Sequence, residues 1–260
     1  MSAVARSTVV TYPATGFGAA FSAVYAGQVA RARTARAPLF FVATLQSLGL
    51  LLLLRGVVDN GRPAEKQQIV AGSVVLVIGF VALNLLAQRF GHLRADGGLD
   101  YYAALPVPPA AVVLATVASY ASFAVPGTVV VAVAGAVLYG LSLTHLWLLV
   151  PVVVLGGAAL AGIGAALGLL APRPELATVC GQLGMSVVLF LGLVRAARMP
   201  LPLRALRAVI PSTYAVDALA QGLGDDPSWS RVGADLAVCA GAAVVALALA
   251  TFAYRRAVSR

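Results

Sequence analysis

The chain has 260 residues, of which 61% are hydrophobic and only 10% are charged, and its formal net charge is +9. Soluble domains carry roughly a quarter charged residues, so this composition excludes an ordinary soluble protein. At about 20 apolar residues per membrane-crossing helix, the length leaves room for about six spans and little else. The basic residues flank apolar segments, which favours contact with lipid head groups and argues against nucleic-acid binding.

Residues 1–37 are expected to form a polar tail followed by a helix at the membrane surface. Apolar side chains recur there at three- and four-residue steps: Phe17, Phe21, Val24, Tyr25 and Val29. Basic residues follow them and no acidic residue does, which predicts an amphipathic helix lying in the membrane interface. The pattern leaves open whether this helix only anchors the chain or also contacts a partner.

Six membrane spans are predicted between residues 38 and 254, and a short tail is expected at 255–260. The spans are placed at 38–58, 69–88, 110–138, 146–171, 176–194 and 232–254. Pro126 lies inside the third span, where proline usually kinks a helix. In the fourth span, Gly164 and Gly168 offer a flat face for close helix contact, and packing inside the subunit is favoured over dimerisation.

A polar segment at 90–109 separates the second and third spans. It begins with a basic turn at His92 and Arg94 and continues with a glycine pair at Gly97 and Gly98. Because this order of residues is too polar to cross a membrane, the segment is expected to lie outside the lipid.

The same segment predicts a short helix from Leu99 to Leu105. Leu99, Tyr102 and Leu105 fall three residues apart, so one face of that helix is apolar, and Asp100 suits its positive N-terminal end. Pro106 stops the helix and forces a sharp bend. A small rigid helix outside the membrane is suited to contact with a partner protein.

The region 195–226 is broken by prolines and is too polar to span, yet it is too apolar to extend into water. It therefore predicts short helices that dip into the outer leaflet before the last span, as a re-entrant loop. The residues singled out in this loop are Pro211, Thr213, Tyr214 and Asp217.

Some kinds of chemistry are missing from the sequence. There is no phosphate-binding glycine loop, and the only lysine, Lys66, lies in a predicted turn, so the chain is not expected to hydrolyse ATP. No charged residue lies near the middle of a predicted span, which argues against an ion-coupled carrier. The two cysteines, Cys180 and Cys239, predict neither a metal site nor a disulfide, and no cofactor is expected on this chain.

Several polar side chains do fall inside the predicted spans. They are Gln46, Asn84, Tyr120, Gln182 and Ser186, of which the last two are four residues apart on one helix face. Such residues either form hydrogen bonds between helices or line a substrate path. Both interpretations remain open from the sequence.

Two of these segments carry a family resemblance. The pattern Arg-x-x-Gly-x-Leu-Asp-Tyr followed by Leu-Pro-Val, at 94–107, resembles the cytoplasmic loop between the second and third spans of permease subunits in type-2 ABC exporters. The pattern Pro-x-Thr-Tyr-x-x-x-Ala-Leu, at 211–219, is similar to the last loop of the same family. The resemblance covers most of the chain and implies one transmembrane permease domain over 1–260.

The resemblance implies that the loop at 91–107 is a coupling helix on which a separate ATPase subunit docks. The residues carried over are Arg94, Gly97, Gly98, Leu99, Asp100, Tyr101, Tyr102, Leu105 and Pro106. Ala95 and Ala103 depart from the family, which often has a charged and a bulkier residue there. The N-terminal helix would be an elbow that also meets the ATPase.

The same resemblance implies the rest of the assembly. Two ATPase copies would bind ATP and Mg²⁺, and a second permease copy or a paralogue would complete a cavity lined by the second and fifth spans. On this chain that cavity points to Asn84, Gln182 and Ser186, and its apolar walls suit an amphipathic or apolar cargo such as a drug, an antibiotic or a lipid.

The location implied is the plasma membrane of a bacterium, with both termini cytoplasmic. Basic residues divide almost evenly between the two sides of the six spans, so charge alone barely favours this orientation, and the loop resemblance decides it. Two other classes stay open: a stand-alone secondary transporter or channel, and a membrane scaffold or immunity protein that moves nothing.

Overall fold

The computed structural model describes residues 16–31, 36–58, 62–193 and 200–258, with side chains omitted at 36–40, 57 and 58. Over these residues the chain forms helices and turns and no strand, which confirms the predicted all-α fold. Three predictions fall outside the described residues: the polar tail at 1–15, the start of the last loop at 194–199, and the end of the C-terminal tail at 259–260.

The described helices run in chain order from α1 to α12, with two π-helical stretches and one 3-10 turn among them. Their bounds are α1 Phe17–Arg31, α2 Arg36–Val58, α3 Pro63–Gly79, η1 Phe80–Leu85, α4 Leu86–Ala95, α5 Gly98–Ala103, α6 Pro109–Tyr139, η2 Leu146–Leu148, α7 Leu149–Pro151, η3 Val152–Gly156, α8 Gly157–Leu170, α9 Pro174–Leu193, α10 Leu201–Val209, α11 Pro211–Gly222 and α12 Trp229–Val258.

Among the described residues, five helices are long and apolar enough to cross a membrane, and a shorter apolar helix lies within α2 at Phe41–Gly56. Together they match the six predicted spans. The third span, α6, continues as one helix through Pro126.

The second span is longer than predicted. The sequence predicts a helix at 69–88, but α3, η1 and α4 form one continuous helix from Pro63 to Ala95, called the central helix below. It starts early because Pro63 stands at the first turn, where proline is well tolerated. It ends late because the polar residues His92 and Arg94 stay helical, and the chain turns only at Gly97, whose φ is 70°.

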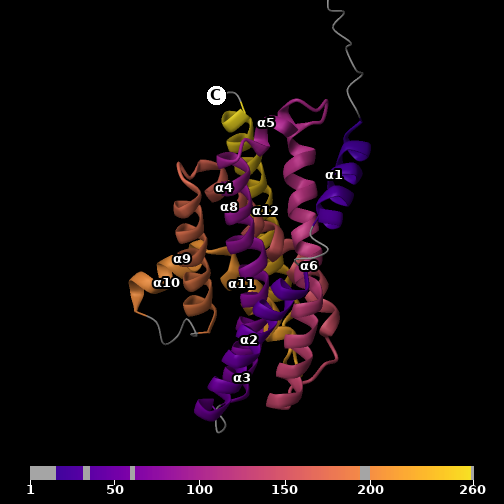
Figure 1. Cartoon of the computed structure of the whole chain (residues 1–260). Helices are drawn as coiled ribbons and strands as arrows, with labels where there is room; N and C mark the ends of the chain where they lie inside the picture. The colour runs from indigo at the N-terminus through magenta and orange to yellow at the C-terminus, as the bar shows by residue number, and fades with distance from the viewer. Residues whose placement is uncertain (1–15, 32–35, 59–61, 194–199, 259–260) are drawn as a thin grey trace, which may run out of the picture.

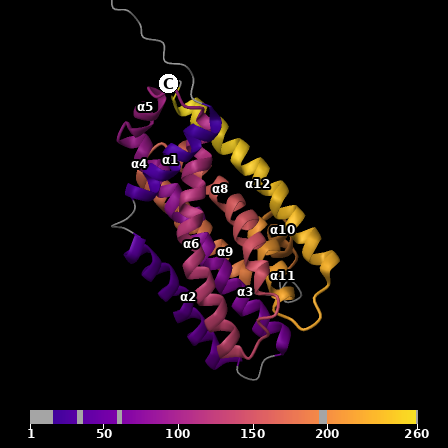
Figure 2. The same cartoon turned by 90° about the vertical axis from the view of Figure 1, so that its right-hand side faces the viewer.

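The two ends of the bundle differ in what they carry. The short helix α5 and the C-terminal end of α12 lie at the same end, and α1 runs beside the same end of α6 (Figures 1 and 2). In the other half of the bundle, α10 projects from the side while α11 lies inside, packed against α12 and α3 (Figure 1). A separate α5 beside the C-terminus agrees with the predicted layout of the loops.

Close contact between the central helix and α8 depends on glycine. A Cβ atom added at Gly164 would lie 2.5 Å from the Leu83 carbonyl oxygen, and one at Gly168 would collide with the Ala87 carbonyl. Gly157, on the same face of α8, approaches Ile78 of the central helix. The predicted packing of this glycine face inside the subunit is therefore confirmed.

The central helix approaches α9 in the same way. A Cβ atom at Gly181 would lie 3.0 Å from Asn84 Oδ1, and one at Gly184 would lie 2.8 Å from the Leu83 side chain. At the far end of the pair, a Cβ atom added at Gly72 would lie 3.1 Å from the Gly192 carbonyl oxygen. The second and fifth spans are therefore in direct contact along much of their length.

Replacing Gly164 with alanine is expected to lower the thermal stability of the purified protein, because the new methyl group overlaps two backbone carbonyls of the central helix. Overpacking of this kind costs about 1–3 kcal/mol. The matched control is Gly241→Ala in α12, where an added Cβ meets nothing within 4 Å. Equal melting temperatures for the two variants would contradict the packing described here.

Candidate functional site

The helix α5 owes its position to the two glycines before it. Gly97 adopts a left-handed conformation that other residues rarely take, and it forms the N-terminal boundary of α5. Gly98 packs closely on the preceding helix, since a Cβ atom there would lie 2.7 Å from the Leu93 side chain. The glycine pair singled out in the sequence thus folds α5 back onto the end of α4.

The apolar face of α5 points inward and not toward solvent. Leu99 is 4% exposed and Tyr102 is 8% exposed, and both belong to the core of the bundle. The predicted helix at 99–105 is found as Gly98–Ala103, so Leu105 follows it and lies at the surface. This burial could not be predicted from the sequence, because the spacing defines an apolar face without showing what covers it.

The surface that α5 presents consists of other residues. Tyr101 is 63% exposed, and Asp100 and Pro106 are exposed as well. Leu105 adds an apolar side chain to this surface. Residues Asp100, Tyr101, Leu105 and Pro106 are called the α5 surface below.

Three helices meet at the buried hydroxyl group of Tyr102. The Nε2 atom of Gln28, on α1, donates to the Tyr102 hydroxyl at 3.1 Å and to Oγ1 of Thr116, on α6, at 3.4 Å. Gln28 is itself buried. Sequence reasoning missed it, because a single glutamine in an apolar helix carries no signal of a partner 74 residues away.

Arg94 is also directed into the protein. Its guanidinium group donates to the carbonyl oxygens of Leu169, at 2.7 Å, and Ala171, at 3.0 Å. These carbonyls end α8, and basic side chains commonly satisfy such groups at helix C-termini. Arg94 therefore joins the end of the central helix to the end of α8.

Three of the polar residues predicted inside the spans, Asn84, Gln182 and Ser186, come together between the central helix and α9. Asn84 is 3% exposed and its Nδ2 donates to Gln182 Oε1 at 3.3 Å. Gln88 donates to Asn84 Oδ1 at 3.0 Å, and the Ser186 hydroxyl donates to the Gln182 carbonyl at 3.0 Å. Gln182 is exposed on α9, so one end of this polar group reaches the surface.

The other two residues of that set lie elsewhere. Gln46 is exposed on α2, and Tyr120 is half-buried on α6. Tyr120 lines a narrow crevice between α2, the central helix and α6, together with Thr44 and Phe123. Among the described residues, no hydrogen bond joins Gln46 or Tyr120 to the group around Asn84.

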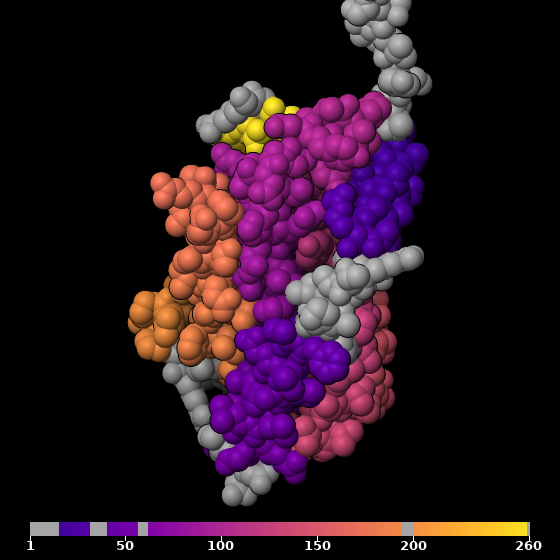
Figure 3. Space-filling model, viewed as in Figure 1, coloured from indigo at the N-terminus to yellow at the C-terminus, as the bar shows by residue number. Residues whose placement is uncertain are grey.

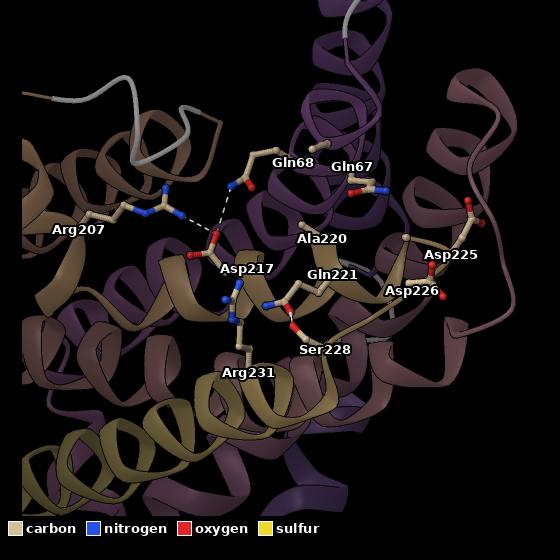
Figure 4. Close-up of a pocket in the computed structure, with 12 residues that line it drawn as sticks. Gln67, Gln68, Arg207, Asp217, Ala220, Gln221, Asp225, Asp226, Ser228 and Arg231 are labelled. Carbon is tan, nitrogen blue, oxygen red and sulfur yellow. Dashed lines mark hydrogen bonds and ion pairs between the residues drawn. The ribbon is translucent and has the colours of Figure 1, made fainter.

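The re-entrant loop is folded as a pair of short helices held by its own polar groups. Pro211 starts α11, the Thr213 hydroxyl donates to the Arg207 carbonyl at 2.7 Å, and the Tyr214 hydroxyl donates to the Ala208 carbonyl at 2.8 Å. Asp217 forms an ion pair with Arg207 (Figure 4). All four predicted loop residues therefore belong to one structured unit.

Arg207 is the residue that this prediction missed. Its side chain is 8% exposed, and it donates to the Leu191 carbonyl of α9 at 2.7 Å while pairing with Asp217 of α11. The Nε2 atom of Gln68, on α3, reaches Asp217 Oδ1 at 3.5 Å and the Gly192 carbonyl at 3.0 Å. In the sequence, Arg207 is one of four arginines in the predicted loop 195–226, and nothing distinguishes it from the others.

These features define a polytopic α-helical membrane protein with a short exposed helix at one end and a re-entrant helical pair in its other half. Over residues 19–223 the chain matches the family model described as ABC-2 type transporter, and it therefore belongs to that family. It is the membrane permease domain of an ABC-2 transporter, the part of such systems that typically lacks catalytic activity. No curated protein matches the chain.

Replacing Asp217 with asparagine is expected to lower the melting temperature, since the buried Arg207 guanidinium loses its charged partner while the shape of the side chain is kept. Hydrogen bonds to charged groups contribute about 1.5–3 kcal/mol. Asp96→Asn, at an exposed position, is the control and should change stability by less than about 0.5 kcal/mol. An unchanged melting curve for the Asp217 variant would show that the ion pair does not hold the loop.

Proposed function

We propose that this chain is the membrane-spanning subunit of an ATP-driven exporter, and that a separate ATPase subunit docks on the α5 surface. The observation that supports this most strongly is the construction of α5. It is a short helix whose Leu99 and Tyr102 side chains are buried in the core, whereas Tyr101 on the helix and Leu105 just after it are exposed. Exposed aromatic and aliphatic side chains on a rigid support are typical of a protein contact.

The contacts of α5 support the transmission of a movement of α5 to the other helices of the bundle. Tyr102 is joined to α1 and α6 through Gln28, and Arg94 joins the adjoining end of the central helix to α8. A displacement of α5 would therefore act on four long elements at once. ATP and Mg²⁺ would bind to the partner, whose closure would shift α5 and switch the access of the cargo cavity.

Two copies of the permease, or one copy and a paralogue, would build that cavity. The side chain of Gln182 is exposed within a membrane span, and an amide facing lipid is unfavourable. Gln46 is exposed on α2 in the same way. Figure 3 looks onto the face where α9 lies beside α4, and we propose that the second copy covers this face.

The cargo is proposed to be an amphipathic or apolar small molecule, a drug, an antibiotic or a lipid. The polar groups on this face are few, chiefly Gln182 and Ser186, and the exposed side chains of α9 around them include Leu183 and Phe190. Walls of this composition favour apolar cargo with a small number of hydrogen-bonding groups.

The orientation follows from the docking proposal. If the ATPase binds the α5 surface, the end of the bundle that carries α5 and the C-terminus is cytoplasmic, and α10 and α11 face the outside of a bacterial plasma membrane. Membership of the ABC-2 family favours this function over a stand-alone secondary transporter, a channel or a scaffold protein. Export by the chain without any ATPase would favour those alternatives.

Replacing Tyr101 with aspartate should reduce stimulation of the partner ATPase by about tenfold, since a loss near 1.4 kcal/mol at a docking contact corresponds to that factor. The variant should insert and fold normally, because Tyr101 is exposed. Leu99→Glu and Tyr102→Asp are poorer tests, because both side chains are buried and the new charges would lie in the core.

The measurement is ATP hydrolysis by the complex of permease and ATPase reconstituted in vesicles, with Tyr101→Phe as the control that keeps the ring. The partner is expected to be encoded beside the permease, in a reading frame with a phosphate-binding glycine loop. Normal copurification, hydrolysis and transport by Tyr101→Asp would show that α5 is not the docking site.

Cys180 gives a test of the proposed pairing of two copies. It is exposed on α9, whereas Cys239 is buried. A flexible bis-maleimide added to membranes is therefore expected to link two copies into a covalent dimer, and Cys180→Ser should abolish the product. If the native mass shows a dimer but no cross-linked product forms, the α9 face lies toward lipid and not at the interface between the two copies.

A further inference from the structure

A cavity of about 520 Å³ opens in the half of the bundle that lies away from α5 (Figure 4). Four elements form its walls: the start of α3, α10, α11 with the loop after it, and the start of α12. It is lined by Ala64, Gln67, Gln68, Arg207, Asp217, Ala220, Gln221, Gly224, Asp225, Asp226, Ser228 and Arg231. This lining is mostly polar and charged.

Hydrogen bonds between these elements hold the walls in place. On one side, Arg207, Asp217 and Gln68 form the bonded group described above (Figure 4). Below it, the Ser228 hydroxyl donates to Gln221 Oε1 at 2.6 Å, which ties the start of α12 to α11. The cavity is therefore built before any ligand enters, and a ligand would not need to order it.

The charge of the cavity is opposite to that of the chain. The protein carries a formal net charge of +9 and only nine acidic residues. Three of the nine, Asp217, Asp225 and Asp226, line the cavity, and a fourth, Asp235, accepts a hydrogen bond from the lining residue Gln221. Two arginines oppose them, and the charge of Arg207 is already balanced by Asp217.

Asp225 and Asp226 lie across the cavity from Arg207 (Figure 4). Both are exposed, and the ion pair found among the described residues involves neither of them. Their carboxylates and the amide oxygen of Gln67 offer hydrogen-bond acceptors to a ligand. A concave surface with one sign of charge also raises the local concentration of the opposite ion.

We propose that this cavity binds a primary ammonium group. The ammonium would donate to Asp225 and Asp226, and the Arg231 guanidinium would donate to an anionic part of the same ligand where one is present. A volume of about 520 Å³ admits a head group or a small amine but not a whole lipid. This proposal does not depend on the coupling function and is tested without an ATPase.

The source of the ammonium group is either a phosphatidylethanolamine head group or a soluble amine. The helix α10 favours contact with lipid beside the cavity: Leu201 and Val209 are each 80% exposed, while Arg207 points into the cavity wall. An amphipathic helix of this kind lies at the boundary between head groups and acyl chains. The two sources share one chemistry, and the experiment separates them.

The test uses the full chain in nanodiscs of phosphatidylglycerol and titrates it with ethanolamine, with N-acetylethanolamine as the neutral analogue. Binding is followed by tryptophan fluorescence, because Trp229 directly follows the lining residue Ser228 and the chain has two tryptophans. The wild type should respond to ethanolamine only. The double variant D225N/D226N should bind it about tenfold more weakly or worse, as expected for lost charged hydrogen bonds.

The matched control is D96N/E175Q, which removes the same charge from exposed positions outside the cavity and should change the affinity less than about twofold. An equal response to the neutral analogue, or equal affinity in D225N/D226N, would overturn the proposal. Nanodiscs that contain phosphatidylethanolamine then identify the source: competition with ethanolamine assigns the site to the lipid, and unchanged affinity assigns it to a soluble amine.

Discussion

The close contact of the central helix with α8 and α9 is the constraint on which the rest of this structure depends. Glycines at 164 and 168 bring α8 against the backbone of the central helix, and Gly181 does the same from α9. Lipid chains are as apolar as leucine, so helices in a membrane gain little from burying apolar side chains and associate through close packing. A single methyl group at these points would separate the helices.

This packing makes the central helix a connection between the two ends of the protein. It runs for 33 residues from Pro63 to Ala95, which at 1.5 Å per residue is about 50 Å. Arg94 and α5 lie at one end, and Gln68, which contacts Asp217, lies near the other. The π-helical stretch Phe80–Leu85 lies between them, and such stretches often mark functional positions in helices. The central helix therefore links the end of the bundle that carries α5 to the wall of the charged cavity.

The sequence predicted the elements of this arrangement better than their contacts. Hydropathy and the positions of proline predicted the spans. Gly97 predicted the turn before α5, because a residue with a left-handed backbone conformation is most often glycine. The spacing of Leu99 and Tyr102 revealed an apolar face but not that α1 and α6 cover it. Gln28, Gln68 and Arg207 could not be paired in advance, because their partners come from distant segments that only the packing of the glycine faces brings near.

The ion pair between the buried Arg207 side chain and the partly exposed Asp217 side chain has a role that apolar contacts could not fill. Removing the Arg207 charge from water is costly, so such a pair contributes little net stability and more often fixes a particular arrangement. Among the residues of α10, only Arg207 is buried, and the outward side chains such as Leu201 and Val209 contact their surroundings without directional bonds. Lipid alone would let α10 slide or rotate. Because Arg207 bonds to the Leu191 carbonyl and to Asp217, it fixes α10 against both α9 and α11, and this is the geometry that closes one wall of the cavity.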